Sequence, residues 1–234
     1  IKNIRANRSK PGLLRQHLTC LRAAQEISDA EVSGAALGSM EVTFEPKAVK
    51  AGCYQFAVGS AGSASLVFQT VLLPLFFADE TSELNLQGGT HNGSAPSFDY
   101  IEGCFLPILA RMGYQSAVSL QRYGFFPAGG GAWQARIVPA GELAILNLDR
   151  RGEITGKQAM ATSARLPAHI TERELHHIQK KTGWPRGCLT QRMVDSVGPG
   201  NIVSLRVNFQ HHSEYFEVVG EKQLAAERGA GRAV

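Results

Sequence analysis

The sequence contains no hydrophobic run long enough to form a membrane-spanning helix. Such a helix needs about 20 consecutive apolar residues. The most apolar stretch, residues 66–78, is shorter and is interrupted by Gln69, Thr70 and Pro74. The start of the sequence does not resemble a secretory signal. We therefore expect no membrane partner.

Cysteine is scarce. The four cysteines stand far apart at Cys20, Cys53, Cys104 and Cys188, without any C-x-x-C pair. Disulfide frameworks are typical of secreted proteins, whereas isolated thiols are typical of reducing compartments. The pattern predicts reduced, mostly buried thiols in a cytoplasmic protein.

Common catalytic and metal-binding signatures are also missing. The glycines at 129–131 are not followed by the Lys-Ser or Lys-Thr of a P-loop. The sequence has no G-x-S-x-G and no H-E-x-x-H motif. The histidine pairs at 176–177 and 211–212 invite a metal, but adjacent side chains on a helix point in different directions. We assign no metal ligand, and His91 stands in a glycine-rich loop without an evident partner.

Acidic residues are missing from the beginning of the chain. Six cations precede the first of them, Glu26: Lys2, Arg5, Arg8, Lys10, Arg15 and Arg22. The whole chain carries a net charge of +4. A local excess of cations attracts phosphates, although a solvated basic face explains the charge equally well. Pro11 is typical of the first position of a helix, so we predict an extended segment that leads into an anion-binding helix N-terminus.

The composition is that of a globular protein with a substantial core. The chain has 234 residues, of which 44% are hydrophobic and 19% are charged. Apolar spacing predicts helices over residues 11–27, 62–78 and 96–112, and strands over residues 40–44, 54–58 and 131–138. Because helices and strands are mixed, we predict an α+β fold with helices on one face of each sheet.

An internal repeat is visible in the first half. Residues 71–76 match residues 104–109, and strand candidates follow at 82–87 and 116–121. The matching prolines are 33 residues apart and the matching glutamines are 34 apart. A shared offset indicates a duplicated helix-plus-strand unit, although chance similarity is not excluded by two short matches. Two prolines in mid-helix predict a shared kink.

The sequence changes character near Asp149. We predict a strand over 156–165, a helix opened by a capping box from Thr171 to Glu174, a hairpin of strands 201–209 and 215–219, and a helix from Glu221. This βαββα unit divides the chain into domains at 1–148 and 149–234. The first residues read as a strand and the last as a helix without a stop signal, so we expect a fragment of a longer protein.

Five segments together resemble a known family. They are IRANRSKPGLLRQHL at 4–18; GSAGS at 59–63 with QTVL at 69–72; GGT at 88–90 with Asn92 and SAP at 94–96; GFFPAGGG at 124–131; and VVGEK at 218–222. Their order and spacing resemble those of RNA 3'-terminal phosphate cyclases, most closely the bacterial enzymes. The likeness extends along essentially the whole chain.

The resemblance implies both a fold and a reaction. It implies repeated α/β units like the C-terminal domain of a translation initiation factor, related to enolpyruvyl transferases, with a smaller inserted βαββ domain. It implies a ligase-type reaction of RNA processing that uses ATP and Mg²⁺ (or Mn²⁺). In that reaction an enzyme histidine is adenylylated, AMP passes to the RNA 3'-phosphate to give RNA-ppA, and the ribose 2'-OH closes a 2',3'-cyclic phosphate.

The resemblance also implies roles for particular residues. Arg5, Arg8 and Gln16 match positions of the catalytic cluster, and guanidinium groups suit the binding of phosphates. Gln69 matches a position that contacts ATP, and Pro96 matches a proline against the adenine. Each has a structural alternative: an ion pair for the arginines, a turn cap for Gln69, a helix start for Pro96.

The chain departs from the family pattern at two places. Nothing matches the glycine-rich segment that precedes the region of Ile1 in the family, and none of the seven histidines matches the family's nucleotidylated histidine. We therefore expect that histidine to lie beyond this chain and the 234 residues alone to be inactive. His91 also stands where bacterial relatives carry an acid.

Two other functions remain open. A non-catalytic cyclase-like protein would bind RNA without labelling by ATP. An enolpyruvyl-transferase-like enzyme would bind a small phosphorylated metabolite without RNA, and the segment from Arg5 to Leu18 argues against it. The sequence does not predict an oligomeric state or the natural RNA substrates.

Overall fold

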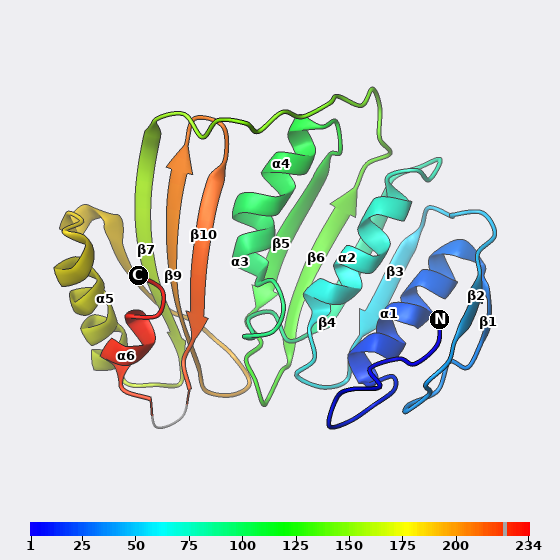
Figure 1. Ribbon diagram of the computed structural model, residues 1–234, viewed down its shortest axis with the longest axis horizontal. Helices are drawn as coiled ribbons and strands as arrows, with labels where there is room; N and C mark the ends of the chain where they lie inside the picture. Colours follow the sequence, from blue (N-terminus) through cyan, green and yellow to red (C-terminus); the bar gives the residue numbers. More distant parts are fainter. Residues whose placement is uncertain (222–223) are drawn as a thin grey trace.

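The computed structural model describes residues 1–221 and 224–234. Two four-stranded sheets stand side by side, each with helices on one face (Figure 1). Strands are both parallel and antiparallel within each sheet. The predicted mixed α+β character is confirmed. No helix among the described residues is both long and apolar enough to cross a bilayer.

The first sheet has the strand order β3-β4-β6-β5. Its strands are β3 (Cys53–Ala57), β4 (Ser82–Gly88), β5 (Ser116–Arg122) and β6 (Gly131–Ile137). Helices α1 (Arg15–Ser28) and α2 (Ala64–Leu75) cover one face, together with a helical run of α3 (Phe98–Tyr100), the π-helical turn η1 (Ile101–Phe105) and α4 (Leu106–Arg111). A small ribbon of β1 (Glu31–Ser33) and β2 (Thr43–Glu45) flanks α1.

The repeat has a clear structural counterpart. Strands β4 and β5 lie on either side of β6 and run in the same direction, antiparallel to β6. Ser82 of β4 and Ser116 of β5, 34 residues apart, both pair with Ile137 of β6. Leu86 and Leu120, again 34 apart, both pair with Trp133. The offset seen in the sequence is therefore the offset of the strand registers.

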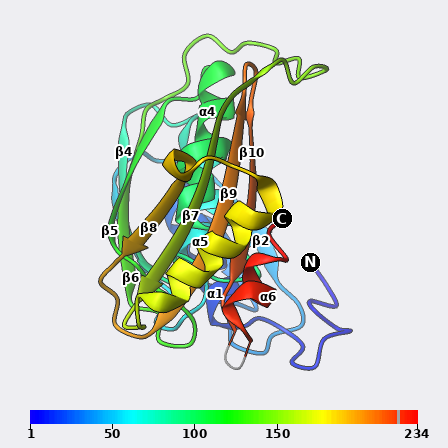
Figure 2. The same cartoon turned by 90° about the vertical axis from the view of Figure 1, so that its left-hand side faces the viewer.

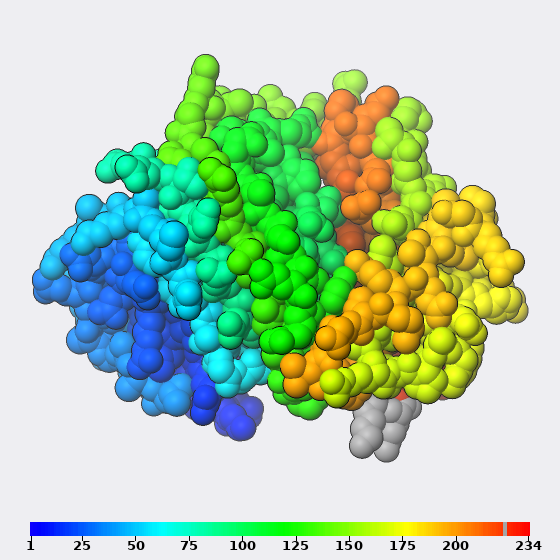
Figure 3. Space-filling view, turned by 180° about the vertical axis from the view of Figure 1, so that it is seen from behind, coloured from blue at the N-terminus to red at the C-terminus, as the bar shows by residue number. Residues whose placement is uncertain are grey.

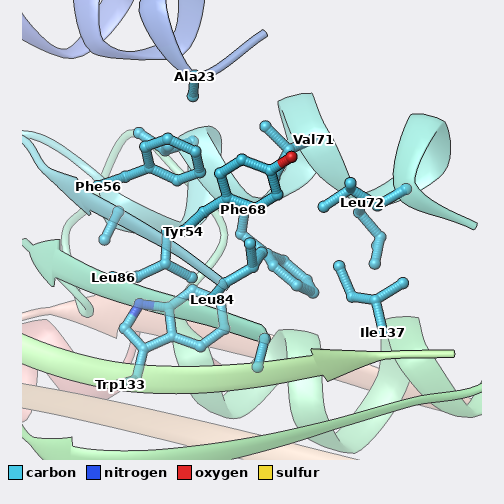
Figure 4. Packing of buried hydrophobic residues seen from close by; sticks show 14 of the residues in the cluster. Ala23, Tyr54, Phe56, Phe68, Val71, Leu72, Leu84, Leu86, Trp133 and Ile137 are labelled. Atoms are coloured by element: carbon cyan, nitrogen blue, oxygen red, sulfur yellow. The ribbon is translucent and has the colours of Figure 1, made fainter. Parts of the chain in front are cut away.

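The core of this first unit is apolar and rich in aromatic rings. Trp133 is 1% exposed and meets Phe68 of α2 edge-on, with the ring centroids 4.9 Å apart (Figure 4). It also meets Phe98 of α3 edge-on, with the centroids 5.3 Å apart. Such edge-to-face contacts are favourable because the positive edge of one ring faces the negative face of another. Alternate residues of β4 and β6 point into this core, which leaves the opposite face of the sheet partly exposed.

The second sheet has the order β10-β9-β7-β8. Its strands are β7 (Ile154–Ala164), β8 (Leu189–Met193), β9 (Gly200–Phe209) and β10 (Ser213–Val219). Helix α5 (His169–Thr182) connects the parallel strands β7 and β8, and η2 (Arg186–Cys188) leads into β8. Helices α5 and α6 (Ala226–Ala230) cover the face that is turned away from the first unit (Figure 2).

Several sequence predictions at the start of the chain are wrong. Residues 1–11 contain turns instead of a strand, and Arg5 has a left-handed φ of 54°. Pro11 does not open a helix, because α1 begins only at Arg15. His17 Nδ1 accepts a hydrogen bond from the Leu14 N–H at 3.1 Å and so caps α1 with a side chain from inside the helix.

The two prolines and the second capping box can be compared with expectation. Pro74 is the eleventh of the twelve residues of α2, and Pro107 is the tenth of the fourteen residues in the unbroken helical run from α3 to α4, so the prolines occupy similar places, nearer the ends than the middles of their helices. Helix α5 begins at His169, before the expected box. Thr171 is buried and donates to the Ala168 carbonyl, and the Glu174 carboxylate accepts from Asn201 instead of capping the helix.

At the end of the chain, α6 is short and ends at Ala230, so the prediction of a long terminal helix is wrong. The hairpin of β9 and β10 is confirmed, and its turn is closed by the N–H of Phe209 donating to the His212 carbonyl. Strand β8 was not predicted. All four cysteines are free, but only Cys104 is buried and Cys53 is exposed.

Candidate functional site

A cleft of about 770 Å³ opens where the two units meet. It lies at the lower edge of Figure 1, where β3, β4 and β10 end and β6 begins. Each of the five segments quoted above contributes to its wall. The lining residues are Gln16, Ser60, Ala61, Gly62, Asn92, Gly93, Ser94, Ala95, Phe126, Pro127, Glu217, Val218, Val219 and Glu221. Folding thus brings segments from opposite ends of the chain to one site.

The loop before α2 forms one wall. Ser63 is the N-cap of α2, and its hydroxyl accepts from the Leu66 N–H at 3.2 Å. The Ser63 N–H itself donates to Oε1 of Gln16 at 3.1 Å, which ties α1 to this loop. The N–H groups of Gly62, Ser63, Ala64 and Leu66 all donate to acceptors within the chain. What this wall offers an anion is therefore the helix dipole and the Ser60 hydroxyl.

The loop after β4 packs directly on the loop before α2. The Asn92 side-chain amide donates to the Ala61 carbonyl at 3.2 Å. A Cβ added at Gly89 would lie only 2.4 Å from the Ala61 carbonyl oxygen, so this contact requires glycine. The two loops meet backbone to backbone and fix the shape of the cleft.

Two carboxylates lie on the opposite wall, at Glu217 of β10 and at Glu221. The Glu217 carboxylate accepts from the Ser97 N–H at 3.3 Å, and its second oxygen is buried with no hydrogen-bond partner among the described residues. Burial raises the pKa of Glu217, although the contact with Ser97 opposes the shift. Glu221 is exposed and pairs with Arg232 at 3.0 Å.

A buried polar chain supports the cleft from behind. His91 is 0% exposed, and its Nδ1 lies 2.8 Å from the Thr90 hydroxyl. Its Nε2 lies 3.6 Å from Asp99, which also pairs with Arg192 of β8 at 2.5 Å. Burial alone would raise the pKa of Asp99, but His91 and Arg192 outweigh it and lower the pKa. This chain connects the first unit to the second.

Apolar side chains add to the same junction. Phe125, Ala164 and Ile202 form a small buried cluster that draws on both units. Tyr123 forms a single β-bridge with Ser196, in the segment after β8. Seen from behind, the yellow-orange segment that contains β8 reaches the green strands of the first unit (Figure 3). The cleft therefore lies between units that are in contact through polar and apolar side chains.

Comparison with known proteins agrees with the five segments. A sequence profile described as RNA 3'-terminal phosphate cyclase matches residues 1–216. The chain belongs to the RNA 3'-terminal phosphate cyclase family. Three relatives with that name align with the whole chain. They come from Ectopseudomonas mendocina (45% identical, 69% of the relative covered), Pseudomonas fluorescens (46%, 68% covered) and Koribacter versatilis (46%, 66% covered).

The five predicted site residues of this cyclase-family chain do not all lie at the cleft. Gln16 lines the cleft. Pro96 directly follows Ala95 of the lining and is half-buried, as is Gln69 on α2. Arg8 is exposed, and the Arg5 guanidinium donates to the backbone carbonyls of Lys10 and Gly12. Of the five, only Gln16 lies among the described residues of the cleft wall.

Other residues that line the cleft were not predicted as site candidates. Ser60, Asn92, Ser94 and Phe126 lie within or between the family motifs, so the motifs themselves contained the signal. Glu217 stands just before its motif and carries no local signal. The described residues contain no group of three or more histidine, cysteine, aspartate or glutamate side chains placed to hold a metal ion. Lys222, the last residue of the fifth motif, lies outside the described residues.

Proposed function

We propose that this chain forms the nucleotide- and RNA-end-binding part of an ATP-dependent RNA 3'-terminal phosphate cyclase. The observation that supports this most strongly is the convergence of all five family motifs on one cleft. Its volume, about 770 Å³, falls within the range of roughly 300–1,000 Å³ common for small-molecule sites. We further propose that the chain has the repeated architecture and inserted domain of the family, divided near residues 148–149.

The residues of the cleft suit the two ligands of the proposed reaction. The Ser60 hydroxyl, beside the N-terminus of α2, would donate to a phosphate group, and Gln16 would orient this loop. By the family resemblance, and from outside the described lining, Pro96 and Gln69 would bind the nucleotide and Arg8 would attract the RNA 3'-phosphate. Arg5 would do so only by releasing the carbonyls of Lys10 and Gly12. A divalent ion that enters with the ATP phosphates would find carboxylates at Glu217 and Glu221. Bound ATP would supply the AMP group that activates the RNA 3'-phosphate and then serves as the leaving group.

Once AMP has passed to the RNA 3'-phosphate, cyclisation needs only one further displacement at phosphorus. The ribose 2'-oxygen bonds to the activated terminal phosphorus, the bond to the AMP oxygen breaks, AMP leaves, and the hydroxyl proton passes to water. Fixed donors and cations stabilise the charge that builds up on the phosphoryl oxygens. Positioning by the cleft is therefore the main contribution of this chain.

We propose that the nucleotidylated histidine is none of the seven present here. None of them is among the described residues that line the cleft. His17 and His91 each stand next to a lining residue in the sequence. The His17 Nδ1 accepts from the Leu14 N–H, and His91 is fully buried between Thr90 and Asp99. The relatives are longer than this chain, which spans about two thirds of their length.

The first test measures binding by the 234-residue chain. We expect it to bind ATP with magnesium, and to bind RNA with a 3'-phosphate more tightly than the same RNA with a 3'-hydroxyl. Gln16→Ala, which removes the contact with the Ser63 N–H, should weaken ATP binding roughly tenfold, as expected for about 1.4 kcal/mol. Gln115→Ala, on an exposed side chain outside the cleft, is the matched control.

The second test is the intact mass of the chain after incubation with magnesium and ATP. We expect 25.2 kDa without an AMP adduct. An adduct would place the nucleophile within these residues and contradict that part of the proposal. RNA binding without ATP binding would favour a non-catalytic cyclase-like protein. Binding of a small phosphorylated metabolite without RNA would favour an enolpyruvyl-transferase-like enzyme.

A further inference from the structure

A second groove, of about 570 Å³, follows α1 away from the cleft. One side is the outer face of α1, and the other is the loop after β1 together with the end of β3. The lining residues are Arg15, Leu18, Thr19, Arg22, Ala35, Ala36, Leu37, Ala57, Val58 and Gly59. None of them was predicted as a site residue, and the proposed cyclisation does not use them.

The charges in this groove have one sign. Arg15 and Arg22 are exposed and seven residues apart on α1, which is about 10 Å along the helix axis. Within the described part of the chain, neither guanidinium lies within 4.0 Å of a carboxylate, and no lining residue is acidic. Lys2, by contrast, pairs with Glu41 at 3.2 Å. The two arginines of the groove are therefore available to an external anion.

The groove leads to the cleft through two neighbouring residues. Gly59 lines the groove and also a small hollow beside it, and Ser60 lines that hollow and the cleft. A terminal nitrogen of Arg15 lies 3.7 Å from the position that a Cβ of Gly59 would occupy. No other atom of the described residues, apart from the chain neighbours of Gly59, lies within 4 Å of that position, so the surface at Gly59 is open beside Arg15. The groove and the cleft therefore adjoin each other through the hollow at Gly59 and Ser60.

The neutral lining residues indicate which part of a nucleic acid this groove could contact. Among the described lining residues there is no aromatic ring for base stacking and no side-chain amide for reading base edges. Phosphodiesters, in contrast, need only cations at suitable intervals. The groove is therefore suited to a sugar-phosphate backbone and not to bases.

We propose that this groove binds the backbone of single-stranded RNA, upstream of the terminal phosphate that the cleft holds. The proposal rests on the proposed function, because it takes the RNA end to lie in the cleft. It assigns Arg15 and Arg22 to phosphates that do not react. Binding in the groove should strengthen with RNA length and be independent of sequence.

The experiment compares two RNAs that end in a 3'-phosphate: a dinucleotide and a single strand of about twelve nucleotides, long enough to reach two further phosphates. Binding is measured by fluorescence anisotropy over a series of salt concentrations. The test variant is the double substitution Arg15→Gln/Arg22→Gln. The matched control, Arg150→Gln/Arg186→Gln, removes the same charge from exposed positions outside the groove and the cleft.

We expect the test variant to bind the longer RNA roughly tenfold more weakly, and to lose about 1.4 from the slope of log Kd against log salt, the value for two phosphates of a single strand. The dinucleotide should lose far less affinity, and the control variant should match the parent. Equal affinity of the test variant and the parent for the longer RNA, or an equal loss in the control, would overturn the proposal.

The two proposals can fail separately. If the chain binds the longer RNA through Arg15 and Arg22 but does not distinguish a 3'-phosphate from a 3'-hydroxyl, the groove is upheld and the proposed function fails. If it distinguishes the two ends but the double substitution changes nothing, the function is upheld and the groove is wrong. If the parent binds no RNA, both fail. Circular dichroism of each variant establishes that the fold is retained.

Discussion

The two units of the molecule are built from similar elements but hold together by different means. The first unit buries Trp133, Phe68 and Phe98 in one large apolar cluster. The second has a smaller cluster in which Ala159 and Ala161 replace such rings. The face of the second sheet toward the first unit is polar and encloses a hollow of about 200 Å³ lined by Arg192, Arg206, Tyr215 and others. The first unit thus has the larger apolar core, and the second meets it through both the Asp99–Arg192 pair and the small cluster around Phe125.

Each unit contains one of the two tryptophans, so the comparison can be measured directly. Trp133 lies in the core of the first unit, and Trp184 follows α5 in the second. Fluorescence in a Trp184→Phe background reports unfolding of the first unit, and fluorescence in a Trp133→Phe background reports the second. The predictions below alter one unit or the junction and ask which unit responds.

The largest effect is expected for Trp133→Ala. Removing this ring leaves a cavity between Phe68 and Phe98, and such substitutions cost about 3–5 kcal/mol. Chemical denaturation followed by circular dichroism should show the loss. Trp184→Ala, at a half-buried position, is the control and should cost much less. Equal losses of unfolding free energy in the two variants would show that the two cores contribute equally to stability.

The next effect depends on pH. Glu174 is 2% exposed, and burial raises its pKa to about 7, against 4.5 in the unfolded chain. The stability that this raised pKa provides is present below pH 4.5 and is lost as the pH rises to about 7. At pH 8 Glu174→Gln should therefore be more stable than the parent by up to about 3 kcal/mol, because the amide can still accept from Asn201 without a buried charge.

The control for this prediction is Glu172→Gln, on the exposed side of the same helix. Its free energy of unfolding should follow that of the parent between pH 4.5 and pH 8. Parallel curves for Glu174→Gln and the parent over that range would show that this carboxyl titrates normally in the folded protein.

The smallest effect is expected at the junction. Arg192→Met leaves Asp99 without its cationic partner in a site where Asp99 is only 17% exposed. Loss of one partner of a mostly buried pair costs about 3 kcal/mol, and we expect about 2 because Arg192 is 31% exposed. The second unit should then unfold at lower denaturant than the first. Asp99→Asn in the same chain should recover part of the loss, and coincident transitions in both tryptophan backgrounds would argue against a polar junction.

Much of the first unit could be predicted from the sequence. Residues 62–78 and 82–87 were predicted as a helix and a strand because their apolar residues follow the helical and the alternating period, and α2 and β4 lie there. The repeat offset of 34 residues was readable because β4 and β5 pair with the same residues of β6. Local periodicity records which face of an element is buried.

Strand β8 could not be predicted for the same reason. Its residues, Leu189–Met193, include three polar side chains and show no clean alternation, because β8 is an edge strand. Its place is set by parallel pairing with β7 across helix α5. The predicted capping box was wrong for a similar reason. The carboxylate of Glu174 accepts its hydrogen bond from Asn201, which is 27 residues away in the sequence.

The sequence by itself determined the family, through five motifs in fixed order, and placed an excess of cations before Glu26. Only the tertiary structure decided which of those cations are free. Arg5 is bound to the carbonyls of its own loop, whereas Arg15 and Arg22 face an open groove. The physical reason is that burial follows a local pattern along the chain, but the partner of a polar side chain depends on which distant segments folding brings beside it.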